Sequence, residues 1–248
     1  MSSFLTPVDG LIRDGTLAPP SLPGQIASLD RFEVLRLIGA GGMGLVFLAR
    51  DPASGNKVAI KLLKPELAVN EIAVKRFLRE ARHVQKLRHP AIVPVLEVST
   101  RAERPYFVMP YFERGSLARL LQPGQPLNRE ETLPLARRIA EALQHAHHHG
   151  IIHRDLKPGN ILMDHESVAC LADFGLARNL IGDSFLDPGQ GHCEGTAPYM
   201  SPAVAANEAE DTRTDIYSFG ALLHEMLTGK PPYDGPSTPE ILDRKSVV

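Results

Sequence analysis

Cysteine is scarce in this 248-residue sequence, which contains only Cys170 and Cys193. Two cysteines so far apart have neither the paired spacing of a metal-binding motif nor the number that a disulfide scaffold needs. An excess of charge of one sign is also missing, because the formal net charge is −2. Charge alone therefore indicates neither a nucleic-acid partner nor a membrane surface, and a reducing, cytoplasmic environment fits the composition.

Long apolar runs are missing too, and none approaches the roughly 20 residues that span a bilayer. Residues 1–25 lack a basic segment followed by an apolar stretch, so they do not resemble a secretory signal. Their proline, glycine and serine content predicts a flexible tail over residues 1–29, with folding beginning near Asp30. Any membrane anchor of a longer parent protein would lie outside this sequence.

The rest of the composition is that of a globular protein, with 43% hydrophobic and 23% charged residues. Apolar runs rich in β-branched residues predict strands, which cover a hairpin over 32–49 and single strands over 57–63, 91–98 and 104–112. Apolar residues at helical spacing predict one helix among them, from Val74 to Leu87 and closed by Pro90.

The pattern changes after these strands. Residues 128–150 predict a long helix with Asn128 as its N-cap and Gly150 just past its end, and residues 215–229 predict another. The sequence therefore predicts an α+β fold of two lobes, the first small and β-rich with one helix and the second larger and mainly helical. A cleft between two such lobes is a common place for a ligand.

Glycines cluster in residues 39–46, Gly-Ala-Gly-Gly-Met-Gly-Leu-Val, which match the pattern G-x-G-x-x-G-x-V. Such glycines let backbone amides approach phosphate oxygens, but a hairpin turn could need them for structural reasons alone. A dinucleotide-binding motif would require a helix directly after the glycines, and this sequence predicts a strand there.

Lys61 ends the run Val-Ala-Ile-Lys on the next predicted strand. Taken alone, a lysine there is more often an exposed surface residue than a functional one. Glu80 lies beside Phe77 and Ala81 at the edge of the apolar face of the predicted helix, where it could reach Lys61. Such an ion pair would hold the lysine toward nucleotide phosphates.

Residues 153–160 read His-Arg-Asp-Leu-Lys-Pro-Gly-Asn, and residues 173–175 read Asp-Phe-Gly. Their charged residues stand beside apolar ones, where burial is costly unless the charges are paired or bind a metal. In this order after the glycine loop, the motifs resemble the catalytic and magnesium-binding loops of protein kinases. The resemblance is to the eukaryotic-like Ser/Thr protein kinases, in particular their bacterial branch, and runs from about Phe32 to Tyr233.

This resemblance implies roles for the charged residues. Asp155 would accept or orient the proton of the target hydroxyl, and Lys157 would stabilise the transferring phosphoryl group. Asn160 and Asp173 would hold Mg²⁺, which prefers oxygen ligands. The implied reaction is transfer of the γ-phosphate of MgATP to Ser or Thr of protein substrates. A kinase homodimer for autophosphorylation is an expected partner. The expected catalytic residues are Asp155, Lys157, Lys61 and Glu80.

The resemblance also implies an adenine site. Residues 109–112, Met-Pro-Tyr-Phe, resemble the hinge between the lobes, where backbone groups of Pro110 and Phe112 would meet adenine. Relatives often carry an acidic residue in place of Pro110, but only its carbonyl should be needed. The expected nucleotide-binding residues are Ile38, Gly39, Ala40, Gly41, Gly42, Met43, Gly44, Val46, Ala59, Lys61, Met109, Pro110, Phe112 and Leu162.

Further positions fit the same family. Lys157 and the pair Gly195-Thr196 favour Ser/Thr over Tyr as the acceptor, and Asp215 resembles the aspartate that braces the catalytic loop. Arg154 precedes Asp155, so control by phosphorylation of the activation loop is expected, with Ser184 as a candidate acceptor. The histidines at 145 and 147–149 are interpreted as cations suited to a helix C-terminus rather than as metal ligands.

Two features depart from the family. Ser201-Pro202-Ala203 replaces its Ala-Pro-Glu, so the glutamate that pairs with a distant arginine is absent. The sequence also stops soon after Tyr233, and its last six residues resemble translated adapter or cloning sequence. We therefore expect a kinase domain over 30–242 that lacks its last helices and is marginally stable. Its expected parts are an N-lobe over about 30–109, a hinge over 110–113, a C-lobe over 114–242 and a non-native tail over 243–248.

Two other functions remain open at this stage. A pseudokinase or ATP-binding scaffold would bind nucleotide without transferring phosphate, although the residues needed for transfer are all present. A small-molecule phosphotransferase of the antibiotic-kinase kind shares part of the loop pattern. Such enzymes usually lack a peptide-docking segment like residues 195–202, Gly-Thr-Ala-Pro-Tyr-Met-Ser-Pro.

Overall fold

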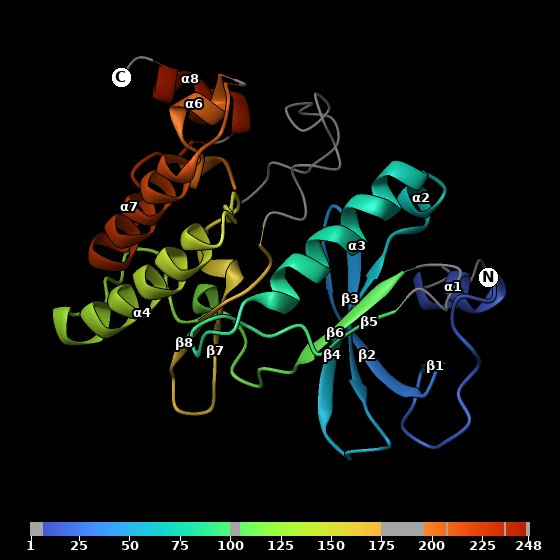
Figure 1. Ribbon diagram of the computed structural model, residues 1–248. Helices are drawn as coiled ribbons and strands as arrows, with labels where there is room; N and C mark the ends of the chain where they lie inside the picture. The colour runs from blue at the N-terminus through green and yellow to red at the C-terminus, as the bar shows by residue number, and fades with distance from the viewer. Residues whose placement is uncertain (1–6, 100–104, 175–195, 207, 236, 247–248) are drawn as a thin grey trace, which may run out of the picture. The chain divides into compact units, whose positions relative to one another are not determined.

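The computed structural model describes residues 7–99, 105–174, 196–206, 208–235 and 237–246 (Figure 1). The chain forms two compact units, one of Met1–Gln85 with Pro94–Tyr111 and the other of Lys86–Val93 with Phe112–Val248. The first is β-rich with one long helix and the second is mainly helical, which confirms the predicted α+β class. The chain passes from the first unit to the second after Tyr111, within the residues predicted as the hinge.

The first unit contains a six-stranded antiparallel sheet in the order β1-β2-β3-β4-β6-β5. Its strands are β1 (Ala27–Leu29), β2 (Phe32–Ala40), β3 (Gly44–Arg50), β4 (Lys57–Leu63), β5 (Glu97–Ser99) and β6 (Tyr106–Pro110). The predicted hairpin is formed by β2 and β3, and the predicted strand 57–63 is β4.

The prediction of a strand over 91–98 is wrong for most of its length, because only Glu97 and Val98 lie in a strand. Residues 91–93 belong to the other unit, where Val93 donates its N–H to the carbonyl of Leu171. Pro94 interrupts the run, since proline has no N–H to donate to a ladder. The apolar residues before Pro94 are buried, whereas Leu96 after it is 53% exposed.

The long helix of the first unit is α3 (Glu71–Lys86), which follows the short α2 (Pro65–Ala68). It begins before the predicted Val74, because the side chain of Asn70 accepts hydrogen bonds from the N–H groups of Ile72 and Ala73. Its buried face packs on the sheet, since the centroid of the Phe77 ring lies 5.4 Å from that of the Phe107 ring of β6.

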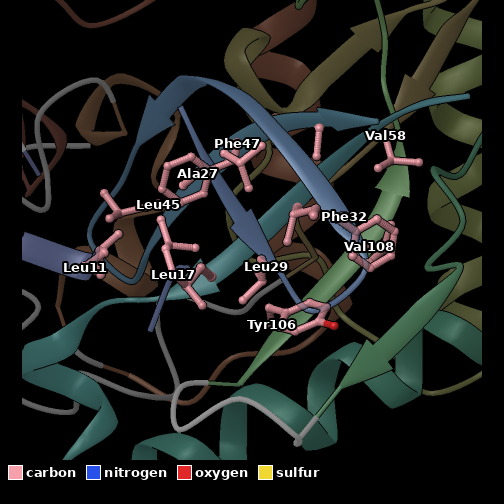
Figure 2. Packing of buried hydrophobic residues seen from close by; sticks show 14 residues of the cluster. Leu11, Leu17, Ala27, Leu29, Phe32, Leu45, Phe47, Val58, Tyr106 and Val108 are labelled. Atoms are coloured by element: carbon pink, nitrogen blue, oxygen red, sulfur yellow. The ribbon is translucent and has the colours of Figure 1, made fainter. Parts of the chain in front are cut away.

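The N-terminal segment is not the flexible tail that the sequence predicts, at least from residue 7 onward. Residues Pro7–Arg13 form α1, and β1 pairs with β2. Figure 2 shows Leu11, Leu17 and Leu29 packed with Phe32 and other buried side chains of the sheet. Proline and glycine content misled the prediction, because the burial of a few widely spaced leucines can order a segment that has no periodic pattern.

Leu17→Ala should therefore destabilise the first unit, although it lies in a region predicted to be a tail. Leu17 is 1% exposed, and emptying such a site costs about 2–5 kcal/mol. Urea unfolding followed by circular dichroism would measure this loss. The matched control is Leu22→Ala, which changes a leucine that is 53% exposed and should alter stability by less than about 0.5 kcal/mol. Equal effects of the two variants would show that Leu17 is not part of the core.

The second unit is built on α4 (Arg129–His148) and α7 (Thr212–Thr228), with a small antiparallel pair of β7 (Ile161–Met163) and β8 (Ala169–Leu171). The predicted cap of α4 is present, because Asn128 and Glu131 each accept a hydrogen bond from the other's backbone N–H. Helix α7 begins before the predicted Asp215, capped by Asp211, and ends at Gly229, whose φ of 74° suits glycine. Shorter helices are η1 (Leu117–Arg119), η2 (Pro158–Asn160), η5 (Ala197–Tyr199) and α6 (Pro202–Ala205).

The last helix of the second unit is α8 (Thr238–Ser246), which extends into the residues predicted to be a non-native tail. Lys245 is buried there, and its ammonium donates to the carbonyls of Pro198 and Met200 at 2.9 and 2.6 Å. Burial lowers the pKa of Lys245 to about 8. The origin of residues 243–248 stays a prediction. Among the described residues, no helix has both the length and the hydrophobicity to cross a membrane.

Candidate active site

The catalytic-loop motif lies in the second unit, between α4 and β7, and Asp215 of α7 holds its backbone. Asp215 is fully buried, and its carboxylate accepts the N–H groups of His153 and Arg154, each at 2.8 Å. This is the bracing contact expected for Asp215. A buried carboxylate needs such donors, since an unpaired charge in a protein interior is very costly.

His147 gives Asp215 a third partner that the sequence did not reveal. Its Nε2 lies 2.7 Å from the Asp215 carboxylate, so the imidazole donates a hydrogen bond there. In a run of consecutive histidines at a helix end, no local signal separates His147 from its neighbours. His145 instead stacks with His89 and His149, with ring centroids 5.0 and 4.5 Å apart. Among the residues that the structure describes, no cluster of three or more ligands could hold a metal ion.

His153 links the catalytic loop to the start of the Asp-Phe-Gly motif. It is fully buried, its Nδ1 accepts the N–H of Asp155 at 3.2 Å, and its Nε2 lies 2.8 Å from the carbonyl of Ala172. Only the neutral tautomer with hydrogen on Nε2 satisfies both contacts. The ring also packs on Phe174, with centroids 4.7 Å apart. His153 therefore positions both motifs at once.

The side chain of Asp155 is the centre of the site. One carboxylate oxygen lies 2.9 Å from Nζ of Lys157 and 2.9 Å from Nδ2 of Asn160. The other accepts the hydroxyl of Thr196 at 3.1 Å, and that hydroxyl accepts Nζ of Lys157 at 2.7 Å. The structure thus brings together four residues that the sequence singled out. Asp155 and Lys157 keep some solvent exposure, so a substrate group could reach them.

Asn160 and Asp173 are the residues expected to hold Mg²⁺. The amide nitrogen of Asn160 donates to both the carboxylate and the backbone carbonyl of Asp155. That use of the nitrogen leaves the amide oxygen as the atom suited to a hard cation. Asp173 has a φ of 56° and Arg154 a φ of 67°, both in a region that non-glycine residues rarely adopt. Such conformations are concentrated at functional sites, where the surrounding contacts hold them.

The glycine loop lies in the first unit, at the turn between β2 and β3, where Gly41 donates its N–H to the carbonyl of Gly44. A Cβ at Gly44 would meet the carbonyl oxygen of Leu62 at 2.6 Å, so sheet packing alone requires this glycine. A Cβ at Gly41 would meet nothing within 4 Å. A purely structural role in the hairpin therefore explains the glycine at 44. It does not explain the glycine at 41, where space for a close ligand is the alternative reason. A strand follows the loop, as predicted, which excludes a dinucleotide-binding turn.

The other expected site residues divide between the two units. Lys61 is buried on β4 and Glu80 lies on α3, both in the first unit, and their pairing stays a prediction. The first unit also contains Ile38, Val46, Ala59, Met109 and Pro110 on its strands, whereas the second contains Phe112, Leu162, Asn160 and Asp173. Gly175, Ser184, Cys193 and Gly195 lie outside the described residues.

The segment after Thr196 is tied to α7 by two contacts. The hydroxyl of Tyr199 donates to Glu225 at 2.5 Å, and the hydroxyl of Ser218 donates to the carbonyl of Tyr199 at 2.8 Å. Burial raises the pKa of both Tyr199 and Glu225. Ala203 stands where the family resemblance expects a glutamate. Ser201 caps α6, because its hydroxyl accepts the N–H of Val204. The side chains of Glu225 and Ser218 on α7 thus hold this segment in place.

Comparison with known proteins matches the sequence of this chain to one family. The family described as "Protein kinase domain" matches residues 32–246. This chain belongs to the protein kinase family. The kinase domain resemblance inferred from the catalytic-loop and Asp-Phe-Gly motifs is therefore confirmed, as is the two-lobed α+β fold class that it implied.

Similar kinases come from several bacteria. The chain is 42% identical over 225 residues to the serine/threonine-protein kinase pkn2 of Myxococcus xanthus, covering 89% of this chain and 26% of that kinase. It is 38% identical to PknB of Mycolicibacterium smegmatis, covering 84% of this chain and 34% of PknB. It is 37% identical to PrkC of Bacillus subtilis, covering 85% of this chain and 32% of PrkC. The match thus spans between a quarter and about a third of each relative.

Proposed function

We propose that this kinase domain transfers the γ-phosphate of ATP to serine or threonine hydroxyls of protein substrates. The observation that carries the proposal is the connected set of Asp155, Lys157, Asn160 and Thr196, with hydrogen bonds and ion pairs of 2.7–3.1 Å. The names of the bacterial serine/threonine kinases that the chain resembles support the same activity.

In this reaction the substrate hydroxyl oxygen forms a bond to the γ-phosphorus while the bond to the bridging β–γ oxygen breaks. Asp155 accepts the hydroxyl proton, because its carboxylate is held in place by three donors and lies partly exposed. Lys157 lies beside Asp155 and stabilises negative charge on the transferring group. Holding these groups in place supplies most of the rate, since phosphoryl transfer asks little covalent chemistry of the protein.

We infer a magnesium site from the donor set. The amide oxygen of Asn160 and the carboxylate of Asp173 are the hard oxygen ligands that Mg²⁺ prefers. Bound there, the ion would neutralise charge on the phosphates during transfer. Adenine would contact backbone groups of Pro110 and Phe112, and the glycine loop would cover the phosphates.

Protein substrates are favoured over small molecules by the segment 196–202. Tyr199 and Ser218 fix this segment to α7, and Thr196 joins it to the carboxylate of Asp155. A peptide acceptor could therefore be placed next to the catalytic group. The deciding experiment uses ATP labelled at the γ-position, with a generic protein acceptor, an aminoglycoside and no acceptor in parallel. Label on Ser or Thr of protein supports the proposal. Label on the aminoglycoside alone, or on nothing despite nucleotide binding, would support the small-molecule or pseudokinase alternative.

Lys61→Met should lower kcat/KM for ATP by roughly 10²–10³-fold, as expected when one group that stabilises transition-state charge is lost. The side chain is buried on β4, and methionine fills a similar volume without the charge. The matched control is Lys57→Met, at the exposed start of the same strand, which should keep parental kinetics. Initial-rate kinetics at varied ATP would measure both. Parental activity in Lys61→Met would remove Lys61 from the site.

A further inference from the structure

Arg154, the residue directly before Asp155, lies against Glu210. Its Nε is 2.9 Å from a carboxylate oxygen of Glu210, at ion-pair distance although the atoms are not aligned as a hydrogen bond. The two side chains are 26% and 15% exposed. The Arg31–Glu97 pair of the first unit is more exposed, at 49% and 32%. The arginine of the Arg50–Glu33 pair is also more exposed than Arg154, at 52%.

Both the backbone and the side chain of Arg154 contact residues around the start of α7. Its backbone N–H donates to Asp215 within the helix, and its guanidinium lies at Glu210, just before the capping residue Asp211. Arg154 also has the left-handed φ of 67°. A non-glycine residue keeps such a backbone only where its contacts enforce it. The side-chain contact with Glu210 is therefore well placed to fix the backbone that carries Asp155.

We propose that Glu210 is a positioning residue for phosphoryl transfer, which rests on the proposed function. Its carboxylate supplies the negative charge that holds Arg154 and, through it, Asp155. From the sequence, a phosphate on the activation loop is expected to pair with Arg154. A carboxylate already in contact with the guanidinium provides this counter-charge without modification. The unphosphorylated kinase is then catalytically competent, because Arg154 does not wait for a phosphate.

The test compares Glu210→Gln with Glu210→Asp in phosphatase-treated protein whose lack of phosphate is verified by mass spectrometry. Glutamine keeps the shape and removes the charge, so kcat should fall by about 10- to 100-fold, as for other losses of alignment at a catalytic centre. KM for ATP should change less than kcat, since Glu210 acts on Asp155 rather than on the nucleotide. Aspartate should restore part of kcat. Glu208→Gln, an exposed glutamate two residues away, is the matched control with parental kinetics.

A double-variant cycle separates positioning from general destabilisation. If Glu210 acts through Arg154, the variant with Arg154→Gln and Glu210→Gln should lose no more kcat than Arg154→Gln alone. The parent, the two single variants and the double variant would also be unfolded in urea. The shift in the unfolding midpoint of the double variant should be smaller than the sum of the shifts of the single variants. Parental kcat in Glu210→Gln, or additive losses in either measurement, would overturn the proposal. Turnover in the untreated parent but none in the phosphatase-treated parent would also overturn the proposal. A parent without turnover in either state would count against the proposed function instead, and additivity in urea would still decide whether Glu210 holds Arg154.

Discussion

Asp155→Asn should reduce kcat by roughly 10²–10⁴-fold, the range that a positioned general base contributes. The asparagine amide has the same shape but cannot accept the proton of the substrate hydroxyl. It also cannot pair in charge with Lys157, which lies 2.9 Å from the carboxylate. The measurement is the initial rate of label transfer to a protein acceptor, with nucleotide binding followed separately by calorimetry.

The control for Asp155→Asn is Glu166→Gln, which makes the same carboxylate-to-amide change at an exposed turn between β7 and β8. It should leave both kcat and nucleotide binding at parental values. We expect Asp155→Asn to retain nucleotide binding, because the proposed adenine and phosphate contacts lie elsewhere. If its turnover stayed within a few-fold of the parent, Asp155 would not be the group that handles the hydroxyl proton.

Asp215→Asn should lower the free energy of unfolding of the second unit by about 3–5 kcal/mol, the usual cost of breaking a buried charged pair. The parent carboxylate accepts hydrogen bonds from His153, Arg154 and His147. An amide replaces one acceptor oxygen by an NH₂ group, which then faces an N–H donor. The catalytic loop would lose its brace, so phosphotransfer should fall as well.

Urea unfolding monitored by circular dichroism would measure the loss in Asp215→Asn. The matched control is Asp234→Asn, an exposed aspartate of the same unit, which should change stability by no more than about 0.5 kcal/mol. A parental unfolding midpoint for Asp215→Asn would mean that the three hydrogen bonds contribute little. Because the kinetic effect would follow from a displaced loop, it should be smaller in His147→Ala, which keeps both backbone contacts to Asp215.

Elements with a strong local pattern were predictable from the sequence. The apolar runs on either side of the glycine turn predicted β2 and β3, and the helical spacing of Phe77, Ala81 and Val84 predicted the buried face of α3. The strand predicted over 91–98 was mostly wrong, because the run is divided at Pro94 between the two units. The prediction of a flexible tail was wrong for residues 7–29, because Leu11 and Leu17 are buried against a sheet that later residues form.

In the candidate site, too, some residues could be predicted from the sequence and others could not. Short motifs identified Asp155, Lys157, Asn160 and Asp173, because the chemistry of phosphoryl transfer requires those residue types close together in the chain. His147 and Glu210 had no such signal, although each contacts a residue of the catalytic loop or its brace.

By itself, the sequence identified the protein kinase family, and its local motifs predicted the proposed reaction and the residues expected to carry it out. Only the tertiary structure decided which distant side chains hold these residues in place. Buried charges such as Asp215 take whichever donors folding brings to them, and the spacing of residues along the chain does not encode that choice.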